Sequence, residues 1–182
     1  ELTKQSGRTT GSLTLSAARQ SKADALVNLR NESWNYNVGL NLKYPVIERY
    51  TLAGSIGYGL KDYLDNRLFV DLKTYIASID LFYIYNTERD LIAGYRIRYG
   101  ETSANTAYYD HAFTAGISGK ILPKIAGTVR AGYQFHEPTQ GSGEASSAIT
   151  ASGQAKWTIT KKLNASLVLS KDISTTSTNT SV

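Results

Sequence analysis

The stretch Trp34–Tyr44 reads WNYNVGLNLKY and alternates strictly between apolar and polar residues. Period-two alternation predicts a β-strand with one apolar face and one polar face. The apolar stripe has aromatic residues at both ends and smaller residues, Val38, Leu40 and Leu42, between them. This layout is typical of a strand that crosses a bilayer in a β-barrel, where rings of Tyr and Trp lie at each headgroup level.

The same pattern recurs as far as Ile173 and predicts about nine strands. They are Gly11–Arg19, Trp34–Tyr44, Tyr50–Lys61, Lys73–Tyr85, Leu91–Tyr99, His111–Ile121, Ile125–Phe135, Ile149–Ile159 and Leu163–Ile173. The predicted fold is an all-β, antiparallel, up-and-down transmembrane β-barrel, and residues 1–182 form a single segment of it. Bacterial single-chain barrels have even strand numbers, so we expect the closing strands to lie in a longer protein. Residues 1–10 are expected to be a periplasmic turn or the start of a strand, and residues 174–182 the start of an outer loop.

Short and long connections alternate between the predicted strands. The short ones are Pro45–Arg49, Asn86–Asp90, Leu122–Lys124 and Thr160–Lys162, and the long ones are Lys61–Val70, Gly100–Tyr108 and Glu137–Ser147. Outer-membrane barrels place short turns on the periplasmic side and longer loops outside the cell. The alternation therefore predicts an orientation as well as a fold.

The aromatic residues of the apolar stripes predict two girdles at the membrane interfaces. The expected interface residues are Trp34, Tyr44, Tyr50, Tyr58, Tyr75, Tyr85, Tyr99, Tyr133 and Trp157, with Phe135 beside them. Trp34 to Tyr44 is a ten-residue span, which at ~3.3 Å per residue and a tilt of ~40° covers about 25 Å, the height of such an apolar band. A soluble antiparallel sandwich also alternates, but its core gives no reason for Tyr to collect at both strand ends. A lipocalin-like barrel, with its apolar residues inside, is not excluded by the stripes alone.

Composition agrees with a barrel without deciding it. The 182 residues contain no cysteine and carry 20 Lys and Arg against 15 Asp and Glu. The sequence contains no run of ~18 apolar residues, so it predicts no transmembrane helix. The basic residues are spread along one face of the strands, without the continuous basic and aromatic patch that nucleic acid binding requires.

Charged residues on the polar faces are expected to line the interior of the barrel. The predicted pore-lining set is Lys43, Asp80, Arg96, Arg98, Lys120, Arg130 and Lys156; Lys61, Asp110 and Asp172 share that face. A mostly basic wall predicts a preference for anionic solutes. The alternative is that the arginines pair with carboxylates such as Asp80 and brace the wall.

Nothing in the sequence predicts catalysis, a metal site or a cofactor. His111 and His136 are the two histidines, each near an outer strand end and without a second nearby ligand, so structural or interfacial roles are expected. No nucleophile elbow, phosphate-binding glycine loop or zinc-ligand spacing is present. Acidic residues in Lys61–Val70 and Glu137–Ser147 could hold Ca²⁺ or lipopolysaccharide-bridging ions, although solvated loop charge accounts for them more simply.

Four segments carry a resemblance to a known family. Tyr36–Pro45, Arg49–Tyr58, Phe113–Lys124 and Gly127–Phe135 resemble the hairpins of Gram-negative outer-membrane barrels of the beta-barrel porin 2 type. The resemblance extends over Trp34 to Asp172 and rests on architectural patterns that many barrels share. It implies a bacterial outer-membrane location and contact with outer-membrane lipid and lipopolysaccharide.

The function expected from these patterns is a porin-like channel for passive passage of small solutes, with a preference for anions. The main alternative is a barrel conduit or anchor subunit of an envelope-spanning assembly, such as polysaccharide export, with periplasmic or surface partner subunits. An outer-membrane enzyme would need a Ser/His/Asp or acidic cluster at the outer rim, and the sequence does not show one.

Overall fold

The computed structural model describes residues 2–6, 9–24, 29–64, 69–140, 144–159 and 163–171. These residues form one antiparallel sheet of ten strands, and every strand pairs with the next one along the chain, in the order β1 to β10. The strands are β1 (Leu2–Ser6), β2 (Thr9–Asp24), β3 (Leu29–Ile47), β4 (Tyr50–Tyr63), β5 (Leu72–Asn86), β6 (Arg89–Thr102), β7 (Ala107–Leu122), β8 (Ile125–Gln140), β9 (Ser146–Thr158) and β10 (Asn164–Lys171). The all-β, antiparallel, up-and-down prediction is confirmed.

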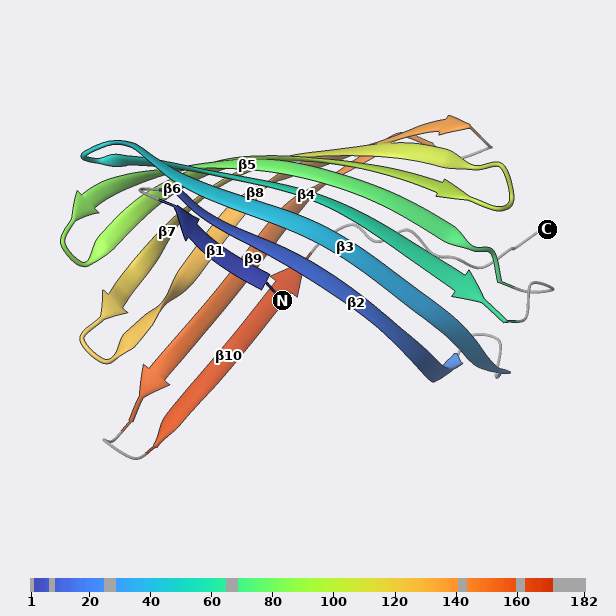
Figure 1. Ribbon diagram of the computed structural model, residues 1–182, viewed down its shortest axis with the longest axis horizontal. Coiled ribbons are helices and arrows are strands. Elements are labelled where there is room, and N and C mark those ends of the chain that lie inside the picture. The colour runs from blue at the N-terminus through green and yellow to red at the C-terminus, as the bar shows by residue number, and fades with distance from the viewer. Residues whose placement is uncertain are drawn as a thin grey trace.

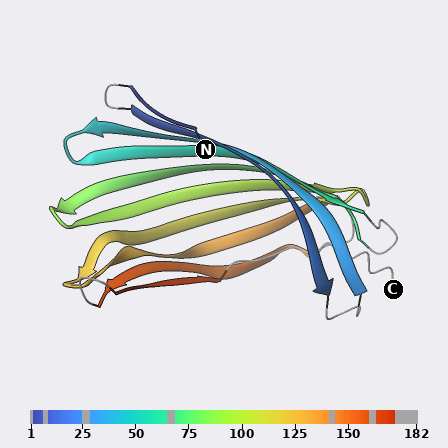
Figure 2. The same cartoon turned by 60° about the horizontal axis from the view of Figure 1, so that its bottom comes forward.

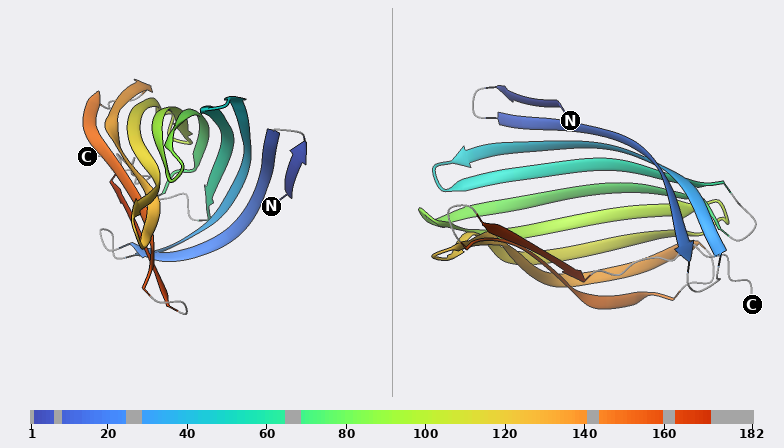
Figure 3. Two further views of the ribbon diagram at one scale, coloured as in Figure 1. Left: turned by 90° about the vertical axis from the view of Figure 1, so that its left-hand side faces the viewer. Right: turned by 90° about the horizontal axis from the view of Figure 1, so that it is seen from below.

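The sheet is a single curved layer. Figure 1 shows the strands arching side by side, and Figure 2 shows them following one another from β1 to β10. Seen along the strands, the layer curls into an open trough with β1 and β10 at its two edges (Figure 3, left). The sheet order does not close on itself in the described part of the chain.

The two faces of the trough differ in chemistry, as the alternation predicted. Side chains on the concave side of a curved sheet converge, whereas those on the convex side splay apart. Asp110, Ala112, Gln134 and Thr150 are all buried and alternate with more exposed residues, so their face is the concave one. The opposite face holds exposed aliphatic and aromatic residues, including Phe113.

The nine predicted strand positions all correspond to strands, and β1 (Leu2–Ser6) adds a tenth within the segment expected as a turn or strand start. Strands β2 to β9 are longer than predicted, whereas β10 is described over Asn164–Lys171, within the predicted Leu163–Ile173. The expected loop Gly100–Tyr108 shrinks to residues 103–106, and most of Glu137–Ser147 is taken up by strands, because β8 runs to Gln140 and β9 begins at Ser146. The predicted turn Thr160–Lys162 and the segment 174–182 lie outside the described residues.

Connections alternate between the two ends of the sheet. The short-turn end, as we call it, holds the two-residue turns 48–49, 87–88 and 123–124. The opposite end, called the loop end, holds residues 103–106, and there β4 ends at Tyr63, β5 begins at Leu72, β8 ends at Gln140 and β9 begins at Ser146. Register shifts stand beside all three of these short turns, between Pro45 and Ile47, Ile84 and Asn86, and Lys120 and Leu122. Such bulges increase local twist, which curls the sheet at this end.

One glycine at the short-turn end is required by the backbone. Gly119 has a φ of 116°, which side-chain-bearing residues rarely adopt, and an added Cβ would collide with the carbonyl oxygen of Glu88. The turn 87–88 can therefore lie directly against β7.

Candidate functional site

The predicted pore-lining residues lie on the concave face, and two of them form an ion pair that crosses several strands. Arg130 on β8 donates from Nη1 to Oδ1 of Asp80 on β5 at 2.7 Å, and both side chains are about one-quarter exposed. The pair spans the two intervening strands, β6 and β7. It passes above Gly94, where an added Cβ would collide with Asp80 and lie 2.9 Å from Thr114 Oγ1 and 3.4 Å from Arg130 Nη1.

A second ion pair lies nearer the loop end of the same face. Arg98, Asp110 and His136 are direct cross-strand neighbours on β6, β7 and β8. Arg98 Nε lies 2.8 Å from Asp110 Oδ2, and His136 Nδ1 lies 2.5 Å from Asp110 Oδ1. The Asp110 side chain is only 3% exposed, so both of its oxygens are committed to this cluster. Tyr108 packs beside His136, with ring centroids 5.0 Å apart.

The other predicted pore-lining residues are more dispersed. Lys43 lies over the ring of Phe82, with Nζ 5.4 Å from its centroid, and Arg96 lies between Ser78 and Ala112 in the register. Lys156 lies on the concave side of β9, next to Ala126 of β8. Lys120 is at the rim, where its Nζ pairs at 2.7 Å with Glu88 of the turn 87–88.

These contacts bear on the two sequence-based interpretations. Arg130 pairs with Asp80 as the bracing alternative proposed, and Arg98 pairs with Asp110. Asp172 lies outside the described residues. Sequence reasoning missed the part played by Gly94, although an alternating strand with a glycine at a polar position can signal a close approach from a neighbour.

The convex face carries the predicted aromatic residues in two rows, one toward each end of the strands. Here a rung means the residues paired directly across neighbouring strands. Tyr58, Tyr75, Tyr99 and Tyr109 occupy one rung of four consecutive strands, with centroid distances of 5.0, 6.0 and 4.9 Å between neighbours. Tyr109 was not among the predicted interface residues, because it follows directly after a predicted loop.

The row nearer the loop end, called the upper row, shifts toward the short-turn end as it crosses the sheet from β3 to β9. Tyr95, Phe113 and Tyr133 share a second rung on β6, β7 and β8, with Ile149 on β9. Phe113 lies four positions closer to the short-turn end than Tyr109 on the same strand. Tyr36 and Trp34, stacked with centroids 6.1 Å apart, begin the row on β3, two and four rungs nearer the loop end than Val38, the partner of Tyr58.

A lower row follows at the short-turn end. Tyr50 and Tyr83 pair across β4 and β5 with centroids 5.1 Å apart, and Trp157 pairs with Ile125 across β9 and β8. The rung of Tyr83 reaches β8 at Val129, so the rung of Trp157 is four positions nearer the short-turn end. Tyr44 and Tyr85 are exposed beside the short turns.

Both rows therefore step by the same amount in the same direction. Tyr50 and Tyr58, Tyr75 and Tyr83, and Ile149 and Trp157 are each eight positions apart along their strands. Eight residues cover ~26 Å along a strand and ~20 Å across a bilayer at a tilt of ~40°. Parallel stepped rows are what tilted strands need in order to keep both rows level with two flat interfaces.

The histidines lie on opposite faces. His136 belongs to the concave cluster, whereas His111 is on the convex face, where its Nδ1 is 2.8 Å from the hydroxyl of Tyr95. Among the described residues, no group of three His, Asp or Glu side chains is placed to hold a metal ion. No helix in the described part of the chain is long and apolar enough to cross a membrane.

The structure is similar to a solved protein described as outer-membrane expressed OmpT of Vibrio cholerae, with a TM-score of 0.53 and 14% sequence identity. The fold is therefore similar to the wall of an outer-membrane β-barrel. The match covers 85% of this chain and 53% of the OmpT chain, so this barrel-wall chain spans about half the length of the structure that it matches. No family model matches the sequence, and no curated protein matches it. The narrower resemblance to the beta-barrel porin 2 type therefore stays a prediction.

Proposed function

We propose that the chain forms part of the wall of a bacterial outer-membrane channel for passive passage of small, preferentially anionic solutes. The observation that carries this proposal is the difference in chemistry between the two faces of the curved sheet. The convex face has a largely apolar band between stepped aromatic rows, and the concave face carries most of the amide, hydroxyl and charged side chains. A wall of this kind separates lipid from water, which is the arrangement that a barrel with an aqueous interior requires.

The charge on the concave face supports the preference for anions. Its described basic residues are Lys43, Lys61, Arg96, Arg98, Lys120, Arg130 and Lys156, and its described acidic residues are Asp80, Asp90 and Asp110. Asp80 and Asp110 are held in ion pairs with arginines. The excess of positive charge raises the local concentration of anions, and basic rings favour anion passage.

The proposal involves no covalent chemistry and no cofactor. Contact with outer-membrane lipid and lipopolysaccharide follows from the apolar band and from its aromatic rows. The ion pair of Lys73 and Glu101, at 3.1 Å, lies on the convex face two rungs beyond Tyr75 and Tyr99, at the level expected for lipid headgroups.

The test is single-channel conductance of the full-length protein in a planar bilayer with a salt gradient. We expect steady conductance with a reversal potential that indicates anion preference, and a shift toward no preference when Lys43 and Lys156 are both replaced by Gln. Lys73→Gln, on the lipid side, is the matched control and leaves the reversal potential unchanged. Cation preference would refute the anion assignment. A silent bilayer, with insertion shown by heat-modifiable gel mobility, would favour the conduit or anchor subunit.

A further inference from the structure

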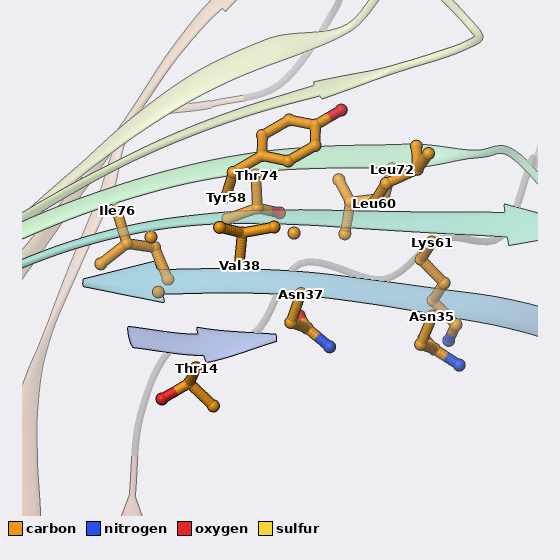
Figure 4. Close-up of a pocket in the computed structure, with 13 residues that line it drawn as sticks. Thr14, Asn35, Asn37, Val38, Tyr58, Leu60, Lys61, Leu72, Thr74 and Ile76 are labelled. Carbon is orange, nitrogen blue, oxygen red and sulfur yellow. The ribbon is translucent and has the colours of Figure 1, made fainter. Parts of the chain in front are cut away.

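A hollow of about 360 Å³ lies on the concave face over β2 to β5, toward the loop end. Part of its floor is bare backbone, because Gly39, Gly57 and Gly59 are close neighbours on β3 and β4. Figure 4 shows Asn35, Asn37 and Lys61 projecting on one side of the ribbon, opposite to Tyr58. The hollow is separate from both ion-pair clusters, and its volume falls within the range of small-molecule sites.

The rim of the hollow carries a defined set of polar groups. Asn35 and Asn37 supply amides, Thr14 and Thr74 supply hydroxyls, and Lys61 supplies one cation. The Asn37 amide donates to Ser16 Oγ at 3.4 Å, and its Oδ1 stands over Gly59, 3.2 Å from where a Cβ would be. Lys61 Nζ lies 4.6 Å from the ring centroid of Tyr63, which holds the ammonium group beside the hollow.

This combination of floor and rim selects a class of ligand. The floor is mostly carbon, from glycine Cα atoms and from the side chain of Ile76, and it suits the C–H face of a ring. The amides and hydroxyls around it suit a ring edge that both donates and accepts hydrogen bonds. One lysine matches one negative charge, whereas a phosphate group would call for several convergent N–H donors.

We infer that this hollow is a binding subsite for an acidic monosaccharide, with the sugar ring over Gly39, Gly57 and Gly59 and its carboxylate toward Lys61. The inference deepens the proposed function, because it names the class of anionic solute that the wall recognises. Its test is therefore a binding measurement that does not depend on conductance.

The chain offers matched valine variants on the same strand. At Gly57 an added Cβ would lie 3.6 Å from the Val38 carbonyl oxygen, and at Gly54 it would lie 3.9 Å from the Ser78 carbonyl oxygen, so both positions accept a side chain. Gly57→Val fills the floor of the hollow, whereas Gly54→Val places the same side chain on the convex face. The two variants have the same gain in strand propensity and differ only in the face.

The experiment is isothermal titration calorimetry of the full-length protein in detergent micelles with D-glucuronate, D-glucose and acetate. We expect glucuronate to bind more tightly than either glucose or acetate. Lys61→Gln should weaken glucuronate binding about ten-fold while changing glucose binding little, since it removes one charge-assisted contact. Gly57→Val should abolish the binding of both sugars, and Gly54→Val should leave it unchanged.

Two results would overturn the inference: glucuronate binding no tighter than acetate binding, or binding that Gly57→Val leaves intact. Conductance of the same preparation separates this outcome from the fate of the channel. Anion-selective conductance without glucuronate binding refutes the subsite and leaves the channel standing. Glucuronate binding without conductance supports the subsite and refutes the channel.

Discussion

At the scale of single residues, the most constrained position on the concave face is a glycine. Gly94 lies beneath the Asp80–Arg130 ion pair, and any larger residue there would push into both Asp80 and Thr114. The glycine lets an arginine from β8 reach a carboxylate on β5 across two strands. The ion pair therefore ties together four strands of the curved wall.

Asp80→Asn tests this tie. The substitution removes the carboxylate and leaves Arg130 charged and partly buried, so the free energy of unfolding should fall by about 1–3 kcal/mol, between the values for exposed and buried pairs. The measurement is urea unfolding of the protein folded in lipid vesicles. Glu88→Gln, which breaks the exposed pair with Lys120, is the control and should cost less than about 1 kcal/mol. Equal losses in the two variants would contradict the bracing role.

The sequence predicted which residues share a face but not which of them meet. Alternation alone places Asp80, Arg96 and Arg130 on the polar side. The contact between Asp80 and Arg130 joins positions 50 residues apart and depends on the register of three strand pairs. Register is set by turn geometry and bulges, which composition does not reveal. The bracing alternative could be formulated from the sequence, but the crossing of Gly94 could not.

At the scale of elements, the turn 87–88 between β5 and β6 is fastened to the neighbouring strand β7. The backbone amide of Lys120 donates to the Glu88 carbonyl oxygen at 2.8 Å, and Arg89 Nε donates to the Lys120 carbonyl oxygen at 2.8 Å. The Lys120 side chain adds an ion pair with the Glu88 carboxylate at 2.7 Å. Backbone hydrogen bonds and side-chain contacts together therefore hold the turn 87–88 against β7.

The rim has a predictable pH dependence. The hydrogen bond and the charge of Lys120 lower the pKa of Glu88 below its ordinary value of 4.5. Because the folded-state pKa is depressed, the contribution of this contact is present above pH 4.5 and is lost as the pH falls through the lower, folded-state value. Carbon-13 NMR titration of the Glu88 carboxyl should show the depressed pKa, and Lys120→Gln should restore it toward 4.5. A Glu88 pKa that Lys120→Gln does not raise would contradict the fastening.

The predicted loops were too long because strand pairing, like the contact between Asp80 and Arg130, depends on neighbouring strands and not on local composition. Gly100–Tyr108 and Glu137–Ser147 are rich in small and polar residues, which favour loops when they are read alone. In the structure their ends extend β6 to β9, because each strand supplies a partner for its neighbour beyond the apolar band. Gly100 pairs with Tyr108, whose ring covers the glycine so closely that an added Cβ would collide with it. An aromatic residue over a glycine stabilises a strand pair that local composition would not predict.

At the scale of the whole molecule, the convex face sets a height for the surrounding bilayer. The eight-residue interval between the stepped rows corresponds to ~20 Å of hydrocarbon. Within that interval, alternate residues of a strand face opposite sides of the sheet. On β9, Ala151 faces outward and Gln154 faces the trough. Neighbouring positions on one strand thus report on lipid and on water.

Ala151→Arg and Gln154→Arg form a matched pair for this assignment. Ala151 lies on the lipid face two residues from Ile149, between the interface and the bilayer centre, so a charge there should lower the free energy of unfolding by about 1–3 kcal/mol, and the same charge on the polar face should change it little. The measurement is urea unfolding in vesicles, with the two variants compared in one lipid. Equal destabilisation of both variants would show that the convex face does not contact hydrocarbon.

The stepped rows also bear on how faithfully the sheet assembles. A slip of one residue between two strands turns apolar side chains toward water, so the alternation itself rejects it. A slip of two residues keeps every side chain on its proper face, so the alternation does not disfavour it. It would, however, break the line of Tyr58, Tyr75, Tyr99 and Tyr109 and carry one part of each aromatic row out of level with the other. A bilayer of fixed thickness should therefore disfavour strand pairings shifted by two residues during insertion, because they place part of each aromatic row away from the interface. Hydrophobic patterning alone does not distinguish these pairings from the correct one.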